Sequence, residues 1–353
     1  MESEIGISKF KNIGGVTCYM NSILAILQQI PILCDYIISD KYKDNFKDSK
    51  IEDKIIFQLH KLFRISMSMD NANLTPSSLR KTCSEIDSTW GELQQQDSCE
   101  FLQFLITKIE EEIGQDVKFI PNLKTEGDKI SVINAIDIIQ SRNEYQNFIK
   151  KEFSIFKTFF TGLEKTTIEC SNCKNEKSKF QIFSIWQLPI PTEKNDRIFE
   201  LKDCMDKWIE NESLDDTDRI SCDFCGLKTN VNKKCSIYYP PKILIIQLKR
   251  FERNLYGNVT KKIDNKINFP INDLDIEDYI SDGSPYKKNS KYNLIAVNLH
   301  IGVTNSGHYY SIVKNRTDNN WYNFNDDCKP EKISMKNDII DRNAYLLFYF
   351  RID

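Results

Sequence analysis

Apolar residues recur every third or fourth position through the first third of the chain, a spacing that predicts amphipathic helices. The pattern is clearest where Phe101, Leu105, Ile109 and Ile113 follow one another at four-residue intervals. A proline or glycine after such a segment predicts its end. We therefore predict helices over residues 18–30, with Pro31 as a stop, over 53–69, over 97–113, with Gly114 as a stop, and over 132–151.

After about residue 155 the pattern changes to short segments rich in β-branched and aromatic residues, with Pro, Asn and Gly at their borders. These features predict strands. Within one of them Ile295, Val297, Leu299 and Ile301 alternate, and we expect them to form one buried face. An antiparallel meander is predicted over residues 292–301, 308–313, 321–325 and 344–350. Helices followed by strands predict an α+β fold.

Composition narrows the class of protein. The 353 residues are 40% hydrophobic and 28% charged, which is ordinary for a globular protein. A net charge of −3 argues against a polyanion-binding protein, so we expect no nucleic-acid partner. The N-terminus lacks a secretory signal pattern, and no apolar run approaches the roughly 18 residues of a membrane span. We expect no membrane association and an intracellular, cytoplasmic or nuclear, location.

Two cysteine pairs share a two-residue spacing, Cys170-Ser-Asn-Cys173 and Cys222-Asp-Phe-Cys225. This spacing lets both thiolates of a knuckle face one ion, and two knuckles complete the tetrahedral set of four sulfurs that zinc accepts. Four thiolates leave no open position for a substrate, so we predict one structural zinc ion. The 48 residues between the pairs place the knuckles at the tips of long strands. Coincidental spacing of four packing or surface thiols is the alternative.

Another cysteine lies where the first helix begins. Cys18 follows Gly14-Gly15-Val16-Thr17, and with Thr17 as N-cap its sulfur falls in the first helical turn. Free backbone N–H groups and the helix dipole favour a thiolate there. The two glycines permit close approach of a substrate carbonyl. A cysteine in such a helix is more often a core residue than a nucleophile.

The remaining cysteines lie singly, and we expect them to act as small packing residues in the core. They are Cys34, Cys83, Cys99, Cys204, Cys235 and Cys328.

A nucleophilic cysteine needs a base, and the chain has three histidines. One of them, His308, opens a predicted strand after a turn rich in Gly, Ser and Asn, a position from which it can reach across a cleft. Asn325 and Asp326 end the next predicted strand, where either can orient the imidazole. Two interpretations remain open here: a catalytic triad with Cys18, or polar residues that merely cap strands.

Eight segments appear in a fixed order from about residue 9 to 351. They are NIGGVTCYMNS (12–22), QQDSCEFL (95–102), FFTG (159–162), PPKILIIQLKRF (240–251), YNLIAVNLHIG (292–302), SGHY (306–309), WYNFNDD (321–327) and AYLLFYF (344–350). Together they resemble the motifs of the ubiquitin-specific protease family of cysteine deubiquitinases.

The resemblance implies a papain-like α+β fold in a single catalytic domain over residues 1–353. It implies a helical thumb (about 9–125), zinc-bearing β fingers (about 155–250) and an antiparallel β palm with interleaved strands (about 250–353). The implied partners are ubiquitin and ubiquitinated proteins, and we expect a monomer.

The implied reaction is hydrolysis of the isopeptide or peptide bond after the C-terminal glycine of ubiquitin, through an acyl-enzyme intermediate. By resemblance, Cys18 takes the place of the nucleophile, His308 that of the general base and acid, and Asn325 that of the residue that orients the imidazole. The family uses either Asp or Asn at this last place. A neutral amide holds the ring but stabilises an imidazolium less than a carboxylate does.

One position departs from the family pattern. The oxyanion-hole asparagine of the family stands five residues before the nucleophile, a place that Ile13 takes here, and Asn12 stands six before. Either Gly14 and Gly15 absorb the extra residue and Asn12 still donates, or the hole relies on backbone N–H groups with help from Asp326.

Asp97 has two interpretations. With Glu100 three residues later it forms a capping-box pattern at a helix start. By resemblance, the equivalent aspartate contacts the extended, arginine-containing tail of ubiquitin, so we treat Asp97 as a substrate-binding candidate.

Two functions of other classes remain as alternatives. One is a catalytically dead family member that binds ubiquitin as a scaffold, which only the shifted Asn12 supports. The other is a zinc-ribbon nucleic-acid binder, which the charge balance and the lack of a basic run near either cysteine pair disfavour.

Overall fold

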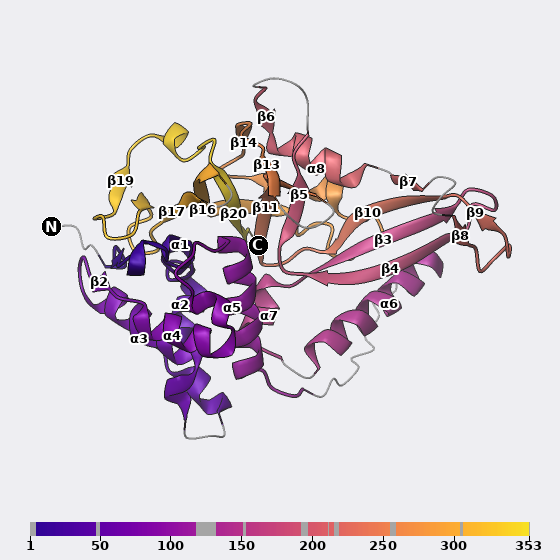
Figure 1. Cartoon of the computed structure of the whole chain (residues 1–353). Coiled ribbons are helices and arrows are strands. Elements are labelled where there is room, and N and C mark those ends of the chain that lie inside the picture. The colour runs from indigo at the N-terminus through magenta and orange to yellow at the C-terminus, as the bar shows by residue number, and fades with distance from the viewer. Residues whose placement is uncertain are drawn as a thin grey trace.

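The structure is a computed structural model that describes residues 5–46, 50–117, 132–150, 153–191, 197–210, 212–214, 219–254, 259–303 and 306–352. It has three parts: a lobe of helices, a large sheet beside this lobe, and a narrow sheet that projects away from both (Figure 1). We call these parts the thumb, the palm and the fingers. The α+β class with a helical thumb, a β palm and β fingers is thereby confirmed. The predicted thumb boundary near residue 125 lies outside the described residues.

The thumb contains three of the predicted helices and two that were not predicted. Its helices are α1 (Cys18–Leu27), α2 (Pro31–Ile38), α3 (Ile55–Ser68), α4 (Ser77–Ile86) and α5 (Ser98–Ile113). We expected Pro31 to end the helical structure. It is instead the first residue of a second helix, α2. The missing N–H of a proline costs nothing at that position, and its fixed φ suits a helix start. Gly114 follows the last residue of α5, as predicted.

The palm is an eight-stranded sheet with the order β19-β18-β17-β16-β20-β11-β5, in which β15 also pairs with β16. Its strands are β5 (Trp186–Pro189), β11 (Ile243–Lys249), β15 (Leu274–Asp275), β16 (Lys291–Val303), β17 (Ser306–Lys314), β18 (Trp321–Phe324), β19 (Glu331–Ile333) and β20 (Ala344–Arg351). Only β16, β17 and β18 form the predicted meander. The last strand, β20, returns between β16 and β11, so the predicted order is wrong for this strand.

A bulge in β16 changes which of its side chains are buried. The pairing of β16 with β20 shifts its register around Ile295, so the alternation changes phase there. Val297 and Leu299 are buried, whereas Ile295 is only partly buried and Ile301 is 47% exposed. The single buried face that we predicted for these four residues is therefore wrong at its two ends.

The fingers are a four-stranded antiparallel sheet with the order β4-β3-β10-β7. Its strands are β3 (Gly162–Cys170), β4 (Glu176–Phe183), β7 (Glu212–Leu214) and β10 (Val231–Tyr239). A short hairpin of β8 (Ile220–Ser221) and β9 (Lys228–Thr229) lies at the tip (Figure 1).

Helix α6 (Val132–Ile149), which the sequence predicted, runs along the fingers. Asp137 of α6 forms an ion pair with Lys165 of β3, with 2.5 Å between Oδ2 and Nζ, and Tyr145 packs against Tyr239 of β10. The other helices of the described residues are α7 (Ile155–Phe160), α8 (Leu201–Ile209) and the short 3-10 helices η1 (Ile13–Gly15), η2 (Lys41–Asn45), η3 (Ile51–Asp53), η4 (Ser88–Gly91), η5 (Glu277–Tyr279) and η6 (Lys336–Asp338). The other strands form short pairs: β1 (Lys9–Phe10) with β2 (Asn73–Leu74), β12 (Phe251–Arg253) with β13 (Val259–Lys262), and β6 (Phe199–Glu200) with β14 (Ile267–Asn268).

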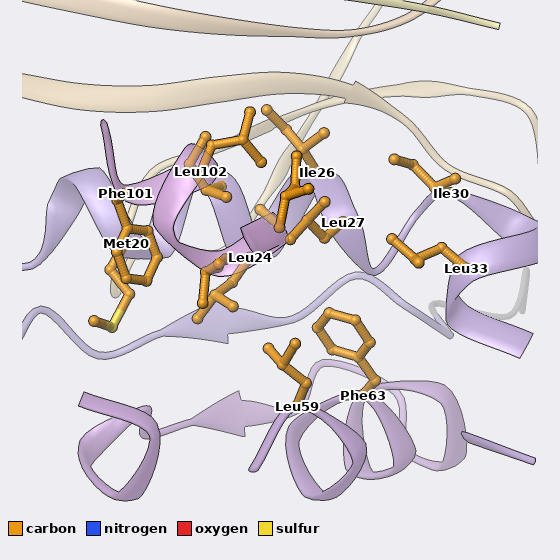
Figure 2. Packing of buried hydrophobic residues seen from close by; sticks show 14 of the residues in the cluster. Met20, Leu24, Ile26, Leu27, Ile30, Leu33, Leu59, Phe63, Phe101 and Leu102 are labelled. Atoms are coloured by element: carbon orange, nitrogen blue, oxygen red, sulfur yellow. The ribbon is translucent and has the colours of Figure 1, made fainter. Parts of the chain in front are cut away.

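Helix α1 is buried along its whole length, because the thumb core closes around it. Its Leu24 and Leu27 pack with Leu59 and Phe63 of α3 and with Phe101 of α5 (Figure 2). Burying a side chain of this size contributes about 1.5–3 kcal/mol. This core also includes residues of β17 and β20, so it fixes the N-terminus of α1 against the palm.

No single helix among the described residues has both the length and the apolar character of a membrane span. Helices α1 and α2 reach that length together only across a bend of 93°.

Candidate active site

Cys18 is the first residue of α1 and is 1% exposed. Thr17 takes the N-cap position, as predicted, but its hydroxyl does not cap the helix. Thr17 Oγ1 instead accepts a hydrogen bond from the N–H of Ile13 at 2.8 Å and so closes the loop before the helix. The sulfur therefore lies in the first turn of a helix, where backbone N–H groups and the helix dipole favour an anion.

Two glycines take up the extra residue that precedes the nucleophile. Gly14 and Gly15 have φ values of 65° and 73°, in the left-handed region that favours glycine. Asn12 consequently returns to the start of α1, where its Oδ1 accepts a hydrogen bond from the N–H of Thr17 at 2.8 Å. Its Nδ2 donates to Asp326 Oδ2 at 2.8 Å. An amide nitrogen carries two N–H donors, so Asn12 can serve Asp326 and a substrate oxygen at once.

His308 in β17 joins Cys18 to Asn325. Its Nε2 lies 2.7 Å from Asn325 Oδ1. Because this oxygen can only accept, Nε2 carries the proton and Nδ1 is left for Cys18. The hydrogen bond with Cys18 is the largest cause that raises the pKa of His308, to about 9; partial burial opposes it, and Asn325 and the charge of Asp326 raise it further. The imidazole is therefore protonated at neutral pH and able to stabilise a thiolate.

Asp326 supplies the negative charge that Asn325 lacks. Its Oδ2 lies 3.9 Å from His308 Nε2, and its Oδ1 accepts a hydrogen bond from Asn21 Nδ2 at 2.7 Å. Burial raises the pKa of Asp326, whereas the hydrogen bond from Asn21, the charge of His308 and the hydrogen bond from Asn12 lower it. A carboxylate held by two amides is thus placed beside the imidazolium without replacing Asn325 as its direct partner.

Asp97 caps helix α5, which confirms one of its two interpretations. Its Oδ1 accepts hydrogen bonds from the N–H groups of Cys99 at 2.7 Å and Glu100 at 3.2 Å. Its Oδ2 accepts from the hydroxyl of Tyr345 in β20 at 2.8 Å. Asp97 thus also connects the thumb to the palm.

Two adjoining clefts run between the thumb and the other parts. The larger, of about 1090 Å³, is lined by residues of α5, the base of the fingers and α8. The smaller, of about 800 Å³, is lined among others by the carboxylates Asp97, Glu100 and Glu252. Gln103 and Gln187 line both clefts, which form one path along the thumb.

The four paired cysteines meet at the fingertip, as the sequence predicted. All four Sγ atoms lie within 4.8 Å of one another, with 4.0 Å between Cys170 and Cys225 and 3.7 Å between Cys173 and Cys222. Four sulfurs bound tetrahedrally at about 2.3 Å from one ion lie about 3.8 Å apart, so this cluster fits zinc. Asn175 Nδ2 donates a hydrogen bond to Cys173 Sγ at 3.4 Å and lowers the pKa of that thiol, which favours the thiolate.

The single cysteines pack in the core with two exceptions. Cys34, Cys83, Cys99 and Cys204 are buried, and burial raises the pKa of each thiol. Cys235 is only partly buried and Cys328 is exposed, so the packing prediction is wrong for Cys328. Cys328 follows the segment that carries Asn325 and Asp326, where the strand has already ended.

The palm sheet carries a second histidine, His300, whose pKa is shifted in the direction opposite to that of His308. His300 in β16 is 2% exposed, and burial lowers its pKa to about 4. It packs against Tyr309 and beneath Gly307, where a Cβ would lie 2.1 Å from His300 Nε2. Glycine is therefore required directly before His308.

Comparison with known proteins places this arrangement in a family. A family model described as ubiquitin carboxyl-terminal hydrolase matches residues 8–349. The chain belongs to this family. Usp2 of Drosophila melanogaster, a ubiquitin carboxyl-terminal hydrolase, is 28% identical over 99% of the chain. Ubiquitin carboxyl-terminal hydrolase 2 of Homo sapiens is 29% identical, also over 99% of the chain. The chain spans 35% and 56% of the length of these two relatives.

Solved structures of the hydrolase family share the fold. The SAGA Ubp8/Sgf11/Sus1/Sgf73 DUB module bound to ubiquitin aldehyde contains a chain that aligns with a TM-score of 0.75 and 28% identity, over 100% of the present chain and 71% of its own length. A second structure of this module, bound to monoubiquitin, aligns with a TM-score of 0.75 and 26% identity.

The sequence did not single out Asn21, which holds Asp326. The signal available was a polar residue three positions after Cys18 in a helix that is apolar from Ile23 onward. Such a residue is buried against its own helix turn or against a distant segment, and only the tertiary structure identifies the partner.

Proposed function

We propose that this chain is a cysteine deubiquitinase that hydrolyses the isopeptide or peptide bond after the C-terminal glycine of ubiquitin. The observation that supports it most is the row of Cys18, His308 and Asn325 at the N-terminus of a buried helix, in which His308 Nε2 lies 2.7 Å from Asn325 Oδ1 and Cys18 is the largest cause that raises the pKa of His308. The names of the relatives and a structural neighbour bound to ubiquitin aldehyde support ubiquitin as the substrate.

In the proposed acylation, the Cys18 thiolate attacks the carbonyl carbon of the terminal glycine. The resulting oxyanion lies near the N-terminus of α1, where the backbone N–H of Cys18 and the second N–H of Asn12 can donate to it. The imidazolium of His308 then gives its proton to the leaving amine, and a thioester remains on Cys18.

In the proposed deacylation, neutral His308 takes a proton from a water molecule that attacks the thioester carbonyl. Collapse of this second tetrahedral intermediate releases ubiquitin with a free carboxylate and returns the proton to the Cys18–His308 pair. Asn325 holds the ring throughout by accepting from Nε2, and Asp326 stabilises its charged form from 3.9 Å.

The proposed path of the ubiquitin tail follows the smaller cleft. Its wall carries three carboxylates, Asp97, Glu100 and Glu252, and two cations, Lys249 and the fully buried Arg250. This small excess of negative charge favours a basic, extended peptide. Asp97 combines this role with its cap of α5, because a carboxylate has more acceptor positions than its N–H partners use.

We propose that the four fingertip cysteines hold one structural zinc ion. When bound, the ion crosslinks the end of β3 to the β8–β9 hairpin. With four thiolate ligands it has no open position, so the reaction at Cys18 does not involve it. A monomeric, intracellular protein without nucleic-acid or membrane partners also stays a prediction.

A ubiquitin derivative with a C-terminal electrophile tests the function. The wild-type protein is expected to form a covalent adduct with this probe, and Cys18→Ala is expected to abolish it. Cys328→Ala is the matched control, because Cys328 is the exposed cysteine most open to unspecific labelling, and it should keep the adduct. Retained ubiquitin binding without an adduct in the wild type would show a scaffold instead.

A further inference from the structure

A buried polar side chain joins the nucleophile helix to the palm. Asn298 of β16 is 0% exposed. Its Nδ2 donates a hydrogen bond to Ser22 Oγ at 2.9 Å, and its Oδ1 accepts one from Ser98 Oγ at 2.8 Å. Ser22 lies one helical turn after Cys18 in α1, and Ser98 is the first residue of α5. One amide thus holds two thumb helices to one palm strand.

The same network reaches the strand that carries the base. The carbonyl oxygen of Ser22 accepts a hydrogen bond from Ser311 Oγ at 3.1 Å, and Ser311 lies opposite Asn298 in the β16–β17 pair. The bonds therefore reach β17 three residues after His308.

These hydrogen bonds restrict the position of α1 along the palm strands, which apolar packing alone leaves free. The leucines and isoleucines between α1 and the palm favour contact, but they specify position along the strand only weakly, since dispersion contacts have no direction. Hydrogen bonds between buried groups are directional, and their loss leaves unpaired polar atoms in a low dielectric. Sliding of α1 along β17 would therefore break several bonds at once.

We propose that Asn298 is a positioning residue of the reaction, which fixes the distance between Cys18 and His308 through Ser22, Ser98 and β17. It touches neither reacting atom. The inference rests on the proposed triad, because it assigns to Asn298 the geometry of that pair. A displacement of about 1 Å between reacting groups costs on the order of 10²-fold in rate.

Asn298→Ser tests the proposal, since a serine is too short to bridge both hydroxyls and adds no apolar bulk. Hydrolysis of a fluorogenic ubiquitin C-terminal amide is expected to show a kcat at least about tenfold lower with KM changed by less than about threefold. Ser98→Ala removes a single hydroxyl and is expected to act in the same direction with a smaller loss. It keeps the test valid if Asn298→Ser does not fold.

The decisive readout is the pKa of His308, measured by NMR on protein with labelled histidines. It is expected to fall from about 9 in both variants, because the hydrogen bond with Cys18 lengthens. Asn315→Ser is the matched control: Asn315 is also buried and bonded to the backbone, but it lies in the turn after β17 and its partners there, Ile5 and Thr317, are outside this network, so its loss should lower stability without moving kcat or this pKa.

An unchanged His308 pKa in folded Asn298→Ser overturns the proposal, whether or not kcat falls. The readout does not depend on turnover. An inactive wild-type protein would contradict the proposed function, whereas the titration would still report on the positioning of His308.

Discussion

The fingertip and the thumb–palm junction hold their side chains in place by opposite means. At the fingertip four cysteines come from two short knuckles, and the neighbouring Phe224 and Leu227 are 77% and 53% exposed. At the junction Cys18 belongs to a core whose buried members are all at most 8% exposed. Among its described residues the fingertip has no cluster of buried hydrophobic side chains, so we expect the proposed zinc ion to fix its geometry. The geometry of the junction depends on packing and buried hydrogen bonds.

The largest expected effect separates chemistry from stability at the junction. His308→Ala should lower kcat/KM by about 10³-fold, since general acid–base catalysis contributes roughly 10²–10⁴-fold. The melting temperature should change little, because the side chain is 39% exposed. Hydrolysis of the fluorogenic ubiquitin substrate and thermal unfolding measure the two quantities. His60→Ala, at a buried histidine of the thumb, should show the reverse, and equal loss of activity in both variants would contradict the assignment.

At the fingertip a single substitution should remove the ligand. Cys222→Ser is expected to lower bound zinc from about one ion per chain to near zero, because three thiolates hold the ion far less tightly than four. Hydrogen exchange should accelerate in β8 and β9 while α1 keeps its protection. Cys235→Ser, at a finger cysteine outside the cluster, should keep the metal. Full zinc content in Cys222→Ser would exclude this ligand set.

The next effect concerns the shifted asparagine. Asn12→Ala is expected to lower kcat at least tenfold, because it removes the proposed oxyanion donor and one of the two amides that hold Asp326. Steady-state kinetics measure it. Asn21→Ala removes only the other amide, so it should cost less. Unchanged kinetics in Asn12→Ala would rule out Asn12 as an oxyanion donor and would mean that the oxyanion hole consists of backbone N–H groups.

A smaller effect should separate the two roles of Asp97. Asp97→Ala removes the cap of α5 and should lower the free energy of unfolding by about 1 kcal/mol. It should also raise KM for the ubiquitin substrate, because a carboxylate is lost from the cleft wall. Denaturant unfolding and kinetics measure the two. A loss of stability with a normal KM would leave the cap as its only role.

The smallest effect is a displacement along the pH axis. The pKa of His308 is raised to about 9, so its imidazolium form, which the proposed mechanism requires, is lost as the pH rises through that value. In a pH profile, kcat/KM is therefore expected to fall on the basic side with a midpoint near that value, and we call this fall the basic limb. Asn325→Ala should move the limb to lower pH, because its hydrogen bond raises the pKa of His308. A limb that stays in place in this variant would show that Asn325 does not stabilise the charged ring.

The sequence predicted local features of both regions well. The C-x2-C spacing identified the four cysteines that meet at the fingertip, because each knuckle is set within four residues. The glycines before Cys18 and the helix start were equally local. The predictions failed where a contact distant in sequence determines the structure. The bulge at Ile295 is set by the pairing of β16 with β20, and the place of β20 beside β16 depends on the whole sheet.

The positioning network shows the same limit. Asn298 is 200 residues from Ser98 and 276 from Ser22 along the chain. Nothing in the local pattern of a buried strand marks one asparagine as a bridge between two helices. The motifs of the family located Cys18, His308 and Asn325, but not the residues that set the distances between them.

The complete burial of α1 has a consequence for synthesis of the protein. Helix α1 ends at Leu27, whereas the strands that cover it, β16 and β17, begin only at Lys291 and Ser306. At about 5–20 residues per second, a ribosome needs roughly 15–60 s to make the intervening chain. During that time an apolar helix with a reactive thiol at its end has no palm to pack on. The nascent chain therefore exposes the apolar side chains of α1, which chaperones can bind, well before His308 has been synthesised.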